Sequence, residues 1–380
     1  MKQDLRVMDS DIHVFEPLSL WAEYLEPRFR DRAPKAAGRG PIVWEVEGKA
    51  IPAFLDQPER QRAWRVRMRR ALSGGPAADA LKAALERRMG GTQPEDMLKA
   101  MDIEGIDVSI VFRTLAGHIT TIDDMEPAFA AALCRAFNRW LFDFCKTDAQ
   151  RLKLAAIVPL QEPALALEEA RFAVRELGAV ALVLPSQPIK GRALYDRDYD
   201  PLWAAAQQMD VAIAFHGIHV GYSEHLARRY LDNLVLGQAV GQPVELMLAL
   251  GSVLTGGSLS RFPRLAMAFL EGNCSWLPWW LWALDERWEK WADRSHFQQQ
   301  EKPSELFARQ CFISIEPDEP FASHVVAELG DDNLVLSSDW PHDDSSYPHA
   351  VDNFLAQAPL SAETKRKVLW DNCARLYQVD

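Results

Sequence analysis

The chain has 380 residues, 48% of them hydrophobic, and a formal net charge of -12. This length is ample for a buried core, whereas the acidic balance is a poor match for nucleic acid, whose phosphates attract basic surfaces. Five scattered cysteines without a CxxC pair indicate reduced thiols in a cytoplasmic protein rather than a disulfide framework.

Two features argue against a secreted or membrane protein. The first ten residues hold no apolar signal core. The most apolar stretch, WLPWWLWAL at 276–284, contains a proline and is much shorter than the about 20 residues that a membrane-spanning helix needs. We therefore expect a cytoplasmic protein that binds neither membranes nor nucleic acid.

Short apolar runs rich in strand-forming residues recur along the chain. Most are apolar on both faces, as strands of a covered parallel sheet are, and segments with helical periodicity lie between them. The predicted strands are 6–14, 107–112, 153–160, 179–185, 211–216, 265–271, 311–315 and 333–339.

Helical signals fill the gaps between these runs. Before the second run, Thr92 and Glu95 have capping-box spacing, and Gly105 ends the segment. The clearest helical segments are 92–105, 129–141, 162–179 and 360–377.

Eight strands alternating with about eight helices predict a (β/α)8 TIM barrel, an α/β fold, as a single domain over 1–380. A doubly wound open sheet is the alternative, although no GxGxxG motif follows an early strand. Residues 38–91 interrupt the alternation and are rich in Arg, Gly and Pro. We expect them to form an insertion after strand 1, either a lid or subunit contact or a solvated basic helix.

Polar residues end most of the predicted strands, and in a barrel the C-terminal strand ends carry the function. Each follows four or more apolar residues, where an unpaired charge would be costly. These residues are Asp11 and His13 on strand one, Arg113, His216, Glu271, Glu316 and Asp339.

A divalent cation is the simplest partner for this ring of imidazoles and carboxylates. Asp11 and His13 are two positions apart on a strand, so they project to the same side. His216 and Asp339 would complete the ligand set from distant strands and leave an open position for water or substrate. Taken singly, each residue is better explained by a hydrogen bond or a turn; together at one mouth they favour a metal site. Asp9 lies on the same face and would orient His13 or a barrel partner, or cap the bottom of the core.

The residues at the strand ends carry a family resemblance. The chain resembles the amidohydrolase superfamily, specifically the branch that includes aminocarboxymuconate-semialdehyde decarboxylase and the resorcylate-type decarboxylases. The shared features are Asp11-x-His13, His216 in AFHG, Asp339 in LSSDWPHDD and the closing segment DNCARLY. The resemblance implies a barrel with one divalent ion, zinc first with manganese or iron as alternatives, in a homo-oligomer, often a dimer.

One departure from the family bears on the reaction. Decarboxylases of this branch commonly have a catalytic His ending strand six, where this chain has Glu271. An imidazole could come instead from His219 or His225 in the loop after strand five.

Two reactions on a small-molecule substrate remain open. In a non-oxidative decarboxylation of an aromatic or unsaturated acid, Asp339 would carry a proton to the carbon that loses CO₂, and Arg113 would clamp a carboxylate. Trp276 in the Trp-rich segment would line the substrate pocket. The alternative is that this segment is a helix whose Trp side chains only pack against the rest of the protein. In a hydrolysis of an amide, ester, lactone or C–C bond, Asp339 or Glu271 would act as the base on metal-activated water, with His219 polarising the carbonyl.

A barrel that only binds or scaffolds would have lost this set of metal ligands, so a non-catalytic role is disfavoured. Cys274 is expected to be a buried thiol and not a nucleophile.

Overall fold

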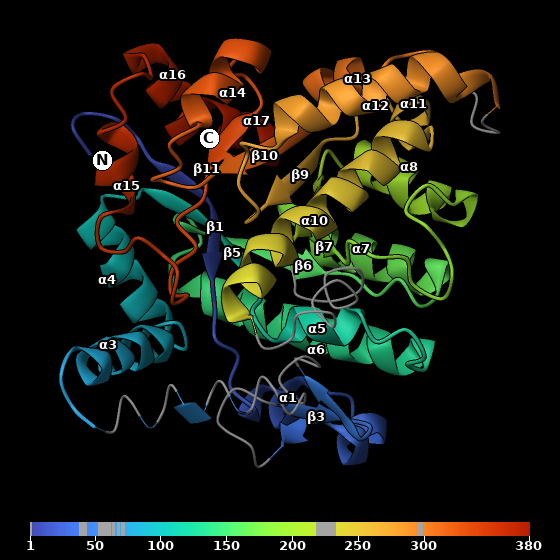
Figure 1. The fold of residues 1–380 in the computed structure, drawn as a ribbon. Helices are drawn as coiled ribbons and strands as arrows, with labels where there is room; N and C mark the ends of the chain where they lie inside the picture. Colours follow the sequence, from blue (N-terminus) through green and yellow to red (C-terminus); the bar gives the residue numbers. More distant parts are fainter. Residues whose placement is uncertain are drawn as a thin grey trace.

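The computed structural model describes residues 2–37, 44–51, 73–217, 233–294 and 299–380, with isolated positions 62, 65, 66 and 69. Within these residues, eight parallel strands form one sheet surrounded by helices (Figure 1). The strands are β1 (Met8–His13), β5 (Val108–Phe112), β6 (Leu152–Ile157), β7 (Ala181–Leu184), β8 (Ala212–His216), β9 (Met267–Leu270), β10 (Cys311–Ile315) and β11 (Leu334–Leu336).

The strands pair in chain order, from β1 through β11, and every pair is parallel. The ring closes between its first strand and the residues that follow its last. The backbone N–H of His13 donates to the Trp340 carbonyl at 2.7 Å, and the N–H of Asp339 donates to the Asp11 carbonyl at 3.2 Å. The predicted (β/α)8 barrel is therefore confirmed, and the doubly wound open sheet is excluded because its edge strands would not meet.

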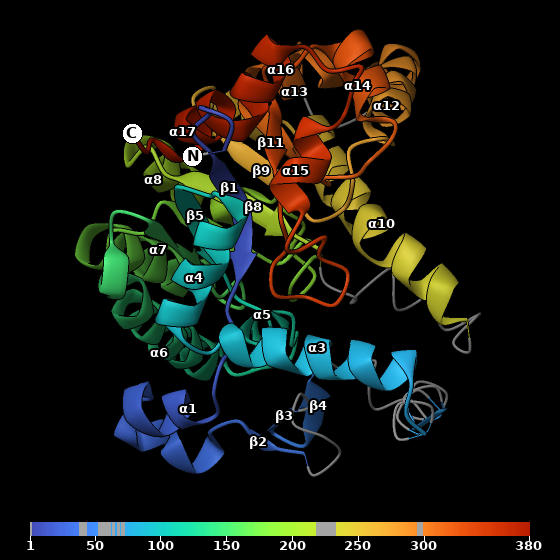
Figure 2. The ribbon, with the colours of Figure 1, turned by 90° about the vertical axis from the view of Figure 1, so that its left-hand side faces the viewer.

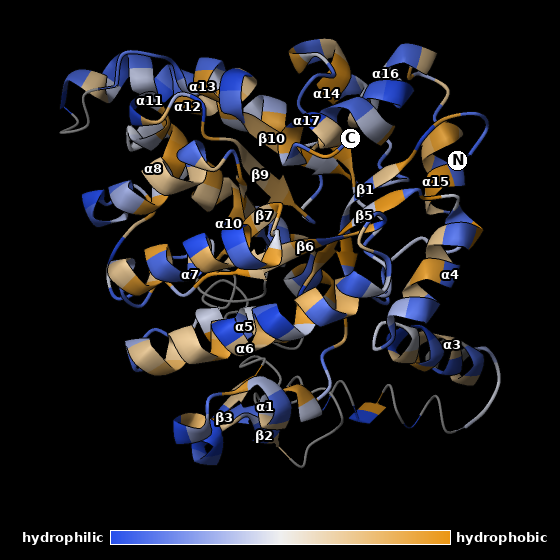
Figure 3. Cartoon of the chain, turned by 180° about the vertical axis from the view of Figure 1, so that it is seen from behind, coloured by the Kyte–Doolittle hydropathy of each residue, from blue (hydrophilic) through white to orange (hydrophobic). Residues whose placement is uncertain are grey.

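The strands form where the sequence is apolar on both faces, because a barrel buries one face inside and the other under helices. Every residue of β5, β7, β8, β9 and β10 is buried. Phe215 and Phe269 stack across the neighbouring strands β8 and β9 with ring centroids 5.2 Å apart. In Figure 3 the strands are mainly orange, while blue bands mark outer helix surfaces such as that of α7.

The helices between the strands cover the barrel (Figures 1 and 2). Those described are α1 (Ser19–Tyr24), α3 (Pro76–Gly90), α4 (Pro94–Glu104), α5 (Ala116–Thr120), α6 (Pro127–Cys145), α7 (Pro163–Leu177), α8 (Asp200–Gln208), α10 (Leu234–Thr255), α11 (Ser258–Arg261), α12 (Leu277–Trp291), α13 (Pro303–Gln310), α14 (Ala322–Leu329), α15 (Ala350–Leu355), α16 (Ala362–Arg366) and α17 (Asn372–Tyr377). None of them is both long and apolar enough to cross a membrane.

The helix boundaries follow Pro and Gly more closely than the predicted capping box. α4 begins at Pro94 after an extended Gln93, and it ends at Gly105 with a left-handed φ of 80°. Thr92 does not cap it, because the Thr92 hydroxyl donates backwards to the Met89 carbonyl at 2.7 Å. The predicted capping box at Thr92 is therefore wrong, since Pro94 already supplies a first-turn residue that has no N–H to satisfy.

The described part of the 38–91 insertion lies beyond the C-terminal end of β1 (Figure 2). It contributes β3 (Trp44–Val46) and β4 (Lys49–Ile51), which form a small antiparallel sheet with the preceding β2 (Lys35–Ala36) in the order β2-β3-β4, and then α3. Trp44 of β3 packs edge-on against Trp21 of α1, with ring centroids 5.6 Å apart. The single-domain assignment and the role of the insertion as lid, subunit contact or solvated helix stay predictions.

Candidate metal centre

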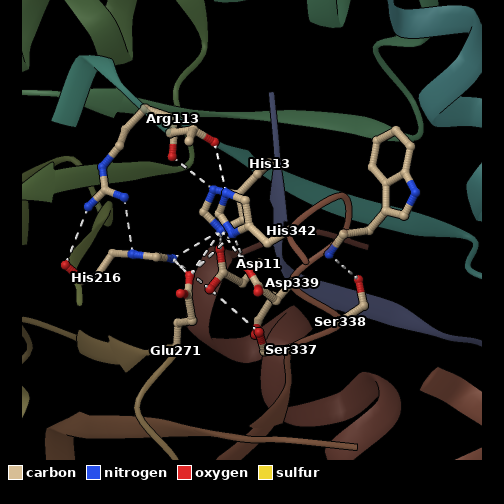
Figure 4. Close-up of polar contacts among 12 residues, drawn as sticks. Asp11, His13, Arg113, His216, Glu271, Ser337, Ser338, Asp339 and His342 are labelled. Atoms are coloured by element: carbon tan, nitrogen blue, oxygen red, sulfur yellow. Dashed lines mark hydrogen bonds and ion pairs between the residues drawn. The ribbon is translucent and has the colours of Figure 1, made fainter. Parts of the chain in front are cut away.

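Four buried side chains meet at the C-terminal mouth of the barrel (Figure 4). Asp11 and His13 come from β1, His216 ends β8, and Glu271 follows β9 directly. The two Asp11 oxygens lie 3.0 Å from His13 Nε2 and 3.0 Å from His216 Nε2. Glu271 Oε2 lies 2.6 Å from His216 Nε2 and 3.4 Å from His13 Nε2. The structure therefore brings together residues from three strands, as the sequence predicted for Asp11, His13 and His216.

Asp339 and His342 form the neighbouring edge of this cluster. Asp339 Oδ1 lies 3.4 Å from His13 Nε2 and 2.5 Å from His342 Nδ1. The His342 ring stacks on the His13 ring with centroids 4.3 Å apart. His342 is not among the predicted site residues, so its direct contact with two of them extends the predicted site. The signal in the sequence is its position three residues after Asp339.

The outer ring nitrogens of the two central imidazoles are engaged by backbone carbonyls. His13 Nδ1 donates to the Arg113 carbonyl at 2.8 Å. His216 Nδ1 has the Gly217 carbonyl oxygen at 2.9 Å, with Arg113 Nη1 on the same ring atom at 3.1 Å. His216 Nδ1 either donates to the Gly217 carbonyl or accepts from Arg113 Nη1; when it donates, Arg113 is held by its Nη2 bond to the His216 carbonyl. With each Nδ1 donating to its carbonyl, the Nε2 atoms keep their lone pairs and face inwards. This is the usual arrangement of metal-binding histidines.

The inward-facing atoms fit a shared cation. His13 Nε2 and His216 Nε2 stand 3.0 Å apart, where two lone pairs would repel without a positive charge between them. Asp11 Oδ1 and Glu271 Oε2 are buried and, apart from these ring nitrogens, have no hydrogen-bond partner among the described residues. One ligand atom from each of the four residues lies within 4.8 Å of every other. Ligands bound at about 2.1 Å to a common ion stand at such separations from one another.

The electrostatics of the cluster also call for positive charge at this point. Burial lowers the pKa of His13, but Asp11 and Glu271 outweigh it and raise that pKa to about 10. The pKa of His216 is likewise raised by Asp11 and Glu271 against the effect of burial. Burial alone would raise the pKa of Asp11 and of Glu271, yet the two imidazoles lower both. Without an ion, two protonated rings balance two carboxylates; a divalent cation supplies the same charge in their place.

Asp339 and His342 take the opposite protonation states. Burial and the nearby Glu271 carboxylate raise the pKa of Asp339 well above its ordinary range. Burial and the charge on His13 lower the pKa of His342 to about 3. A neutral His342 that donates from Nδ1 to Asp339 presents a lone pair on Nε2, 3.0 Å from Thr114 Oγ1. The edge of the site therefore holds a carboxylic acid beside a neutral imidazole.

Both acidic residues that follow strands β9 and β11 have strained backbones. Glu271 has φ 55° and Asp339 has φ 53°, in the left-handed region that residues with a side chain rarely adopt. The Glu271 N–H donates to Ser314 Oγ at 2.9 Å, and Gln242 Nε2 of α10 donates to Glu271 Oε1. These contacts hold the strained turn and direct Glu271 Oε2 towards the imidazoles.

Asp9 contributes to the wall of the site and does not touch His13. Its carboxylate accepts hydrogen bonds from the N–H groups of Asp11 and Ser338, both at 3.1 Å, and from the Ser338 hydroxyl. Of the roles considered for Asp9, the structure supports contact with a barrel partner, because these bonds join β1 to the residues after β11.

The remaining predicted site residues occupy different surroundings. The Arg113 guanidinium lies behind His216 and is almost fully buried. Trp276 precedes α12, and its indole N–H donates to the Gly272 carbonyl at 2.7 Å. The Glu316 N–H donates to Glu319 Oε2 at 3.4 Å, and burial together with the Glu271 and Glu319 carboxylates raises the pKa of the Glu316 carboxyl. His219 and His225 lie outside the described residues.

The Trp-rich segment divides between packing and exposure. Trp279 and Trp282 on α12 are 57% and 62% exposed, so more than half of each side chain stays outside the packing of the described residues. Trp280 packs on α10, where a Cβ on Gly251 would come within 3.1 Å of its ring. Cys274, expected to be a buried thiol, is fully buried, and all five cysteines are free.

The comparisons with known proteins agree with this architecture. The family model described as Amidohydrolase matches residues 9–379. A gamma-resorcylate decarboxylase from Rhizobium sp. (strain MTP-10005) is 27% identical over 293 residues, which cover 74% of this chain and 86% of that protein.

Two solved structures share the fold at lower identity. An amidohydrolase from Mycobacterium avium subsp. paratuberculosis K-10 superposes with a TM-score of 0.79 at 21% identity and covers 99% of this chain and 100% of that one. A dihydroxybenzoic acid decarboxylase from Polaromonas sp. JS666, solved with manganese and 2-nitroresorcinol, has a TM-score of 0.67 at 18% identity and covers 98% of this chain and 96% of that one.

Proposed function

The chain belongs to the amidohydrolase family, and on that premise we propose that it is a metal-dependent non-oxidative decarboxylase of a small aromatic or unsaturated carboxylic acid. The observation that carries the proposal is the cluster of Asp11, His13, His216 and Glu271 at the barrel mouth, with the acid Asp339 at its edge. Curated relatives of this chain are named as gamma-resorcylate and aminocarboxymuconate-semialdehyde decarboxylases, which supports the reaction class.

The residues that would hold the ion are Asp11, His13, His216 and Glu271, which present their ligand atoms to a common point. A bound divalent ion supplies Lewis-acid polarisation of a substrate oxygen. Arg113 holds the His216 side of this set, and the His13 ring is fixed by the Arg113 carbonyl. The earlier assignment of Asp339 as a fourth ligand gives way in this proposal to Glu271, which lies closer to His216.

Asp339 is proposed as the proton donor. It is buried, and its Oδ1 receives the hydrogen bond from His342 Nδ1, so its other oxygen is available to carry the proton. In the proposed step, that proton goes to the substrate carbon that bears the carboxylate. The bond from that carbon to the carboxylate then breaks, its electron pair stays with the ring, and CO₂ leaves. Asp339 regains a proton from solvent.

The reaction class is tested by following the carbon and oxygen atoms of the substrate. The metal-loaded protein is incubated with 2,6-dihydroxybenzoate and 5-carboxyvanillate, the compounds for which structural neighbours are named. A decarboxylase releases CO₂ and leaves the product with one solvent hydrogen and no ¹⁸O from labelled water. A panel of esters and lactones is tested in parallel. The proposal is overturned if these compounds take up ¹⁸O from labelled water and neither acid releases CO₂.

A metal-dependent hydrolase is the second candidate, and Glu271 is the observation that favours it. Glu271 Oε2 is buried and, apart from the ring nitrogens of His13 and His216, has no hydrogen-bond partner among the described residues. An anionic group there would repel a substrate carboxylate. If Glu271 binds the metal ion, as proposed above, the positive charge of the ion offsets the repulsion between Glu271 and a substrate carboxylate. Glu271 then no longer argues against decarboxylation.

Three finer points belong to the same proposal. Zinc is proposed as the resident ion, with manganese as the alternative because a structural neighbour was solved with it. A homodimer and a cytoplasmic location are also proposed. Metal analysis of protein purified without added metal tests the first, and native mass spectrometry tests the second.

A further inference from the structure

We propose that Glu16 is a positioning residue that anchors residues 113–116 and, through them, sets the orientation of three imidazoles in the candidate metal centre. The inference rests on the proposed function, because it concerns the same site. In the sequence, Glu16 stands just beyond the predicted first strand and directly before Pro17.

Residues 113 and 114 contact all three imidazoles from their outer sides, and Figure 4 shows Arg113 beside His13 and His216. His13 Nδ1 donates to the Arg113 carbonyl at 2.8 Å. Arg113 Nη2 donates to the His216 carbonyl at 3.3 Å, while Nη1 lies 3.1 Å from His216 Nδ1. The Thr114 hydroxyl lies 3.0 Å from His342 Nε2. A shift of this short segment would therefore move His13, His216 and His342 together.

Glu16 fixes this segment by its backbone. Its buried carboxylate accepts from Thr114 N–H at 2.9 Å, Leu115 N–H at 2.9 Å and Ala116 N–H at 3.0 Å. These N–H groups belong to the end of the β5 loop and the start of α5, where no helical carbonyl is available to accept them. Since Glu16 lies three residues after His13, the same carboxylate ties the end of β1 to the end of β5.

Gly117 completes the arrangement by leaving room for Arg113. A Cβ at this position would lie 2.1 Å from Arg113 Nε and 2.4 Å from Arg113 Cδ. Arg113 Nε has no hydrogen-bond partner among the described residues, so the guanidinium is held by packing and by its contacts to His216. Any side chain at position 117 displaces the guanidinium from that place.

A purely structural role for Glu16 makes a different prediction, and the chain offers a matched control. Glu104 is also buried, and its carboxylate accepts from Ala350 N–H at 2.9 Å and Val351 N–H at 3.1 Å at the start of α15. It makes no contact with the metal centre. Replacing either residue by Gln leaves one acceptor oxygen and turns an amide group towards a backbone N–H, so both variants lose a comparable cap.

The experiment measures Mn²⁺ affinity and thermal midpoint for wild type, Glu16→Gln and Glu104→Gln. Free Mn²⁺ is followed by electron paramagnetic resonance during titration of the metal-free proteins, and the absorption bands of bound Co²⁺ report ligand geometry. We expect Glu16→Gln to weaken Mn²⁺ binding about tenfold or more and to change the Co²⁺ bands, as loss of a supporting contact around ligands does. Glu104→Gln should keep wild-type affinity and bands while its thermal midpoint falls.

Wild-type affinity in Glu16→Gln, or an equal loss of affinity in Glu104→Gln, would overturn the inference. Gly117→Ala provides a second test, which leaves Glu16 intact. It also replaces the first test if Glu16→Gln yields no folded protein. It should weaken Mn²⁺ binding by displacing Arg113, and unchanged affinity there counts against the inference. Failure of wild type to bind any Mn²⁺ or Co²⁺ would instead refute the proposed metal centre.

Discussion

Glu271 Oε2 lies 2.6 Å from His216 Nε2, and this contact joins the ends of two neighbouring strands. His216 pairs with Leu270 in the parallel register of β8 and β9, so Glu271 is the first residue beyond that pair. Its left-handed φ of 55° turns the carboxylate back across the strand end instead of out to solvent. Glu271 thereby lies among the candidate ligands of the proposed metal ion, where the sequence had suggested a base.

Glu271→Gln should weaken binding of the divalent ion by at least about tenfold, because it removes one negative charge from the proposed ligand set. Chelator competition with Mn²⁺ measures the change. Glu363→Gln on the exposed surface of α16 is the control and should bind like wild type. Wild-type metal affinity combined with lost turnover would assign Glu271 to the chemical step and favour the hydrolase.

Asp339→Asn should separate proton donation from metal binding. Asn keeps the size of the side chain but has no acidic proton, so turnover should fall by about 10²- to 10⁴-fold. Metal affinity should stay within about threefold of wild type, because Asp339 lies at the edge of the four-residue cluster. Turnover and metal content are measured on the same preparations. A parallel loss of metal and activity would restore Asp339 as a principal ligand.

Metal binding should release protons, and its affinity should rise with pH. In the metal-free protein the pKa of His13 is raised to about 10, so that ring is protonated near neutral pH, and the pKa of His216 is raised in the same direction by Asp11 and Glu271. An ion that binds Nε2 of both rings displaces the proton of His13 and any proton that His216 holds, so about one to two protons leave per ion. Raising the pH towards 10 removes the competing protons and tightens binding.

Calorimetric titration in two buffers with different heats of ionisation counts the protons released. Glu271→Gln is the matched comparison, since Glu271 contributes to both raised pKa values, and it should release fewer protons per ion at the same pH. A proton count near zero for wild type between pH 7 and 8 would show that the imidazoles are already neutral and would remove the charge argument for the site.

The barrel could be predicted because each strand is recognisable from its own short apolar sequence. CFISI at 311–315 became β10 without a change of boundary, and the other strands fall within or one residue outside their predicted runs. Asp11 and His13 could be assigned to one side of β1 because strand alternation needs only their spacing. The capping box at Thr92 failed because two rules competed there, and Pro94 decided where the helix begins.

The rest of the site depends on turns that follow the strands. The direction of the Glu271 side chain is set by a positive φ and by contacts to Ser314 and Gln242. Both contact residues are far from Glu271 in sequence. Glu16 acts on backbone N–H groups about a hundred positions away, which no side-chain pattern reveals. Strand periodicity thus predicts which residues reach the mouth, whereas their mutual distances require the folded loops.

Cys274 gives a test of whether a thiol nucleophile takes part. Its side chain is fully buried, and its Sγ donates to Glu319 Oε2 at 3.4 Å. Burial, with the Glu319 carboxylate beside it, raises the pKa of the thiol well above its ordinary value, so the reactive thiolate is suppressed. Glu319 also accepts from the Cys274 and Ser275 N–H groups at 3.0 and 2.7 Å, which points to a structural role for this loop.

Cys274→Ser keeps a donor for Glu319 and should leave turnover within about threefold of wild type, since no thiolate is lost from the reaction. The native protein should also resist iodoacetamide, whereas the denatured chain should react at all five cysteines. Turnover and mass spectrometry of the alkylated protein check the two expectations. A hundredfold loss of turnover in folded, metal-loaded Cys274→Ser, together with fast alkylation of native Cys274, would make the thiol a participant and require a reaction other than the proposed decarboxylation.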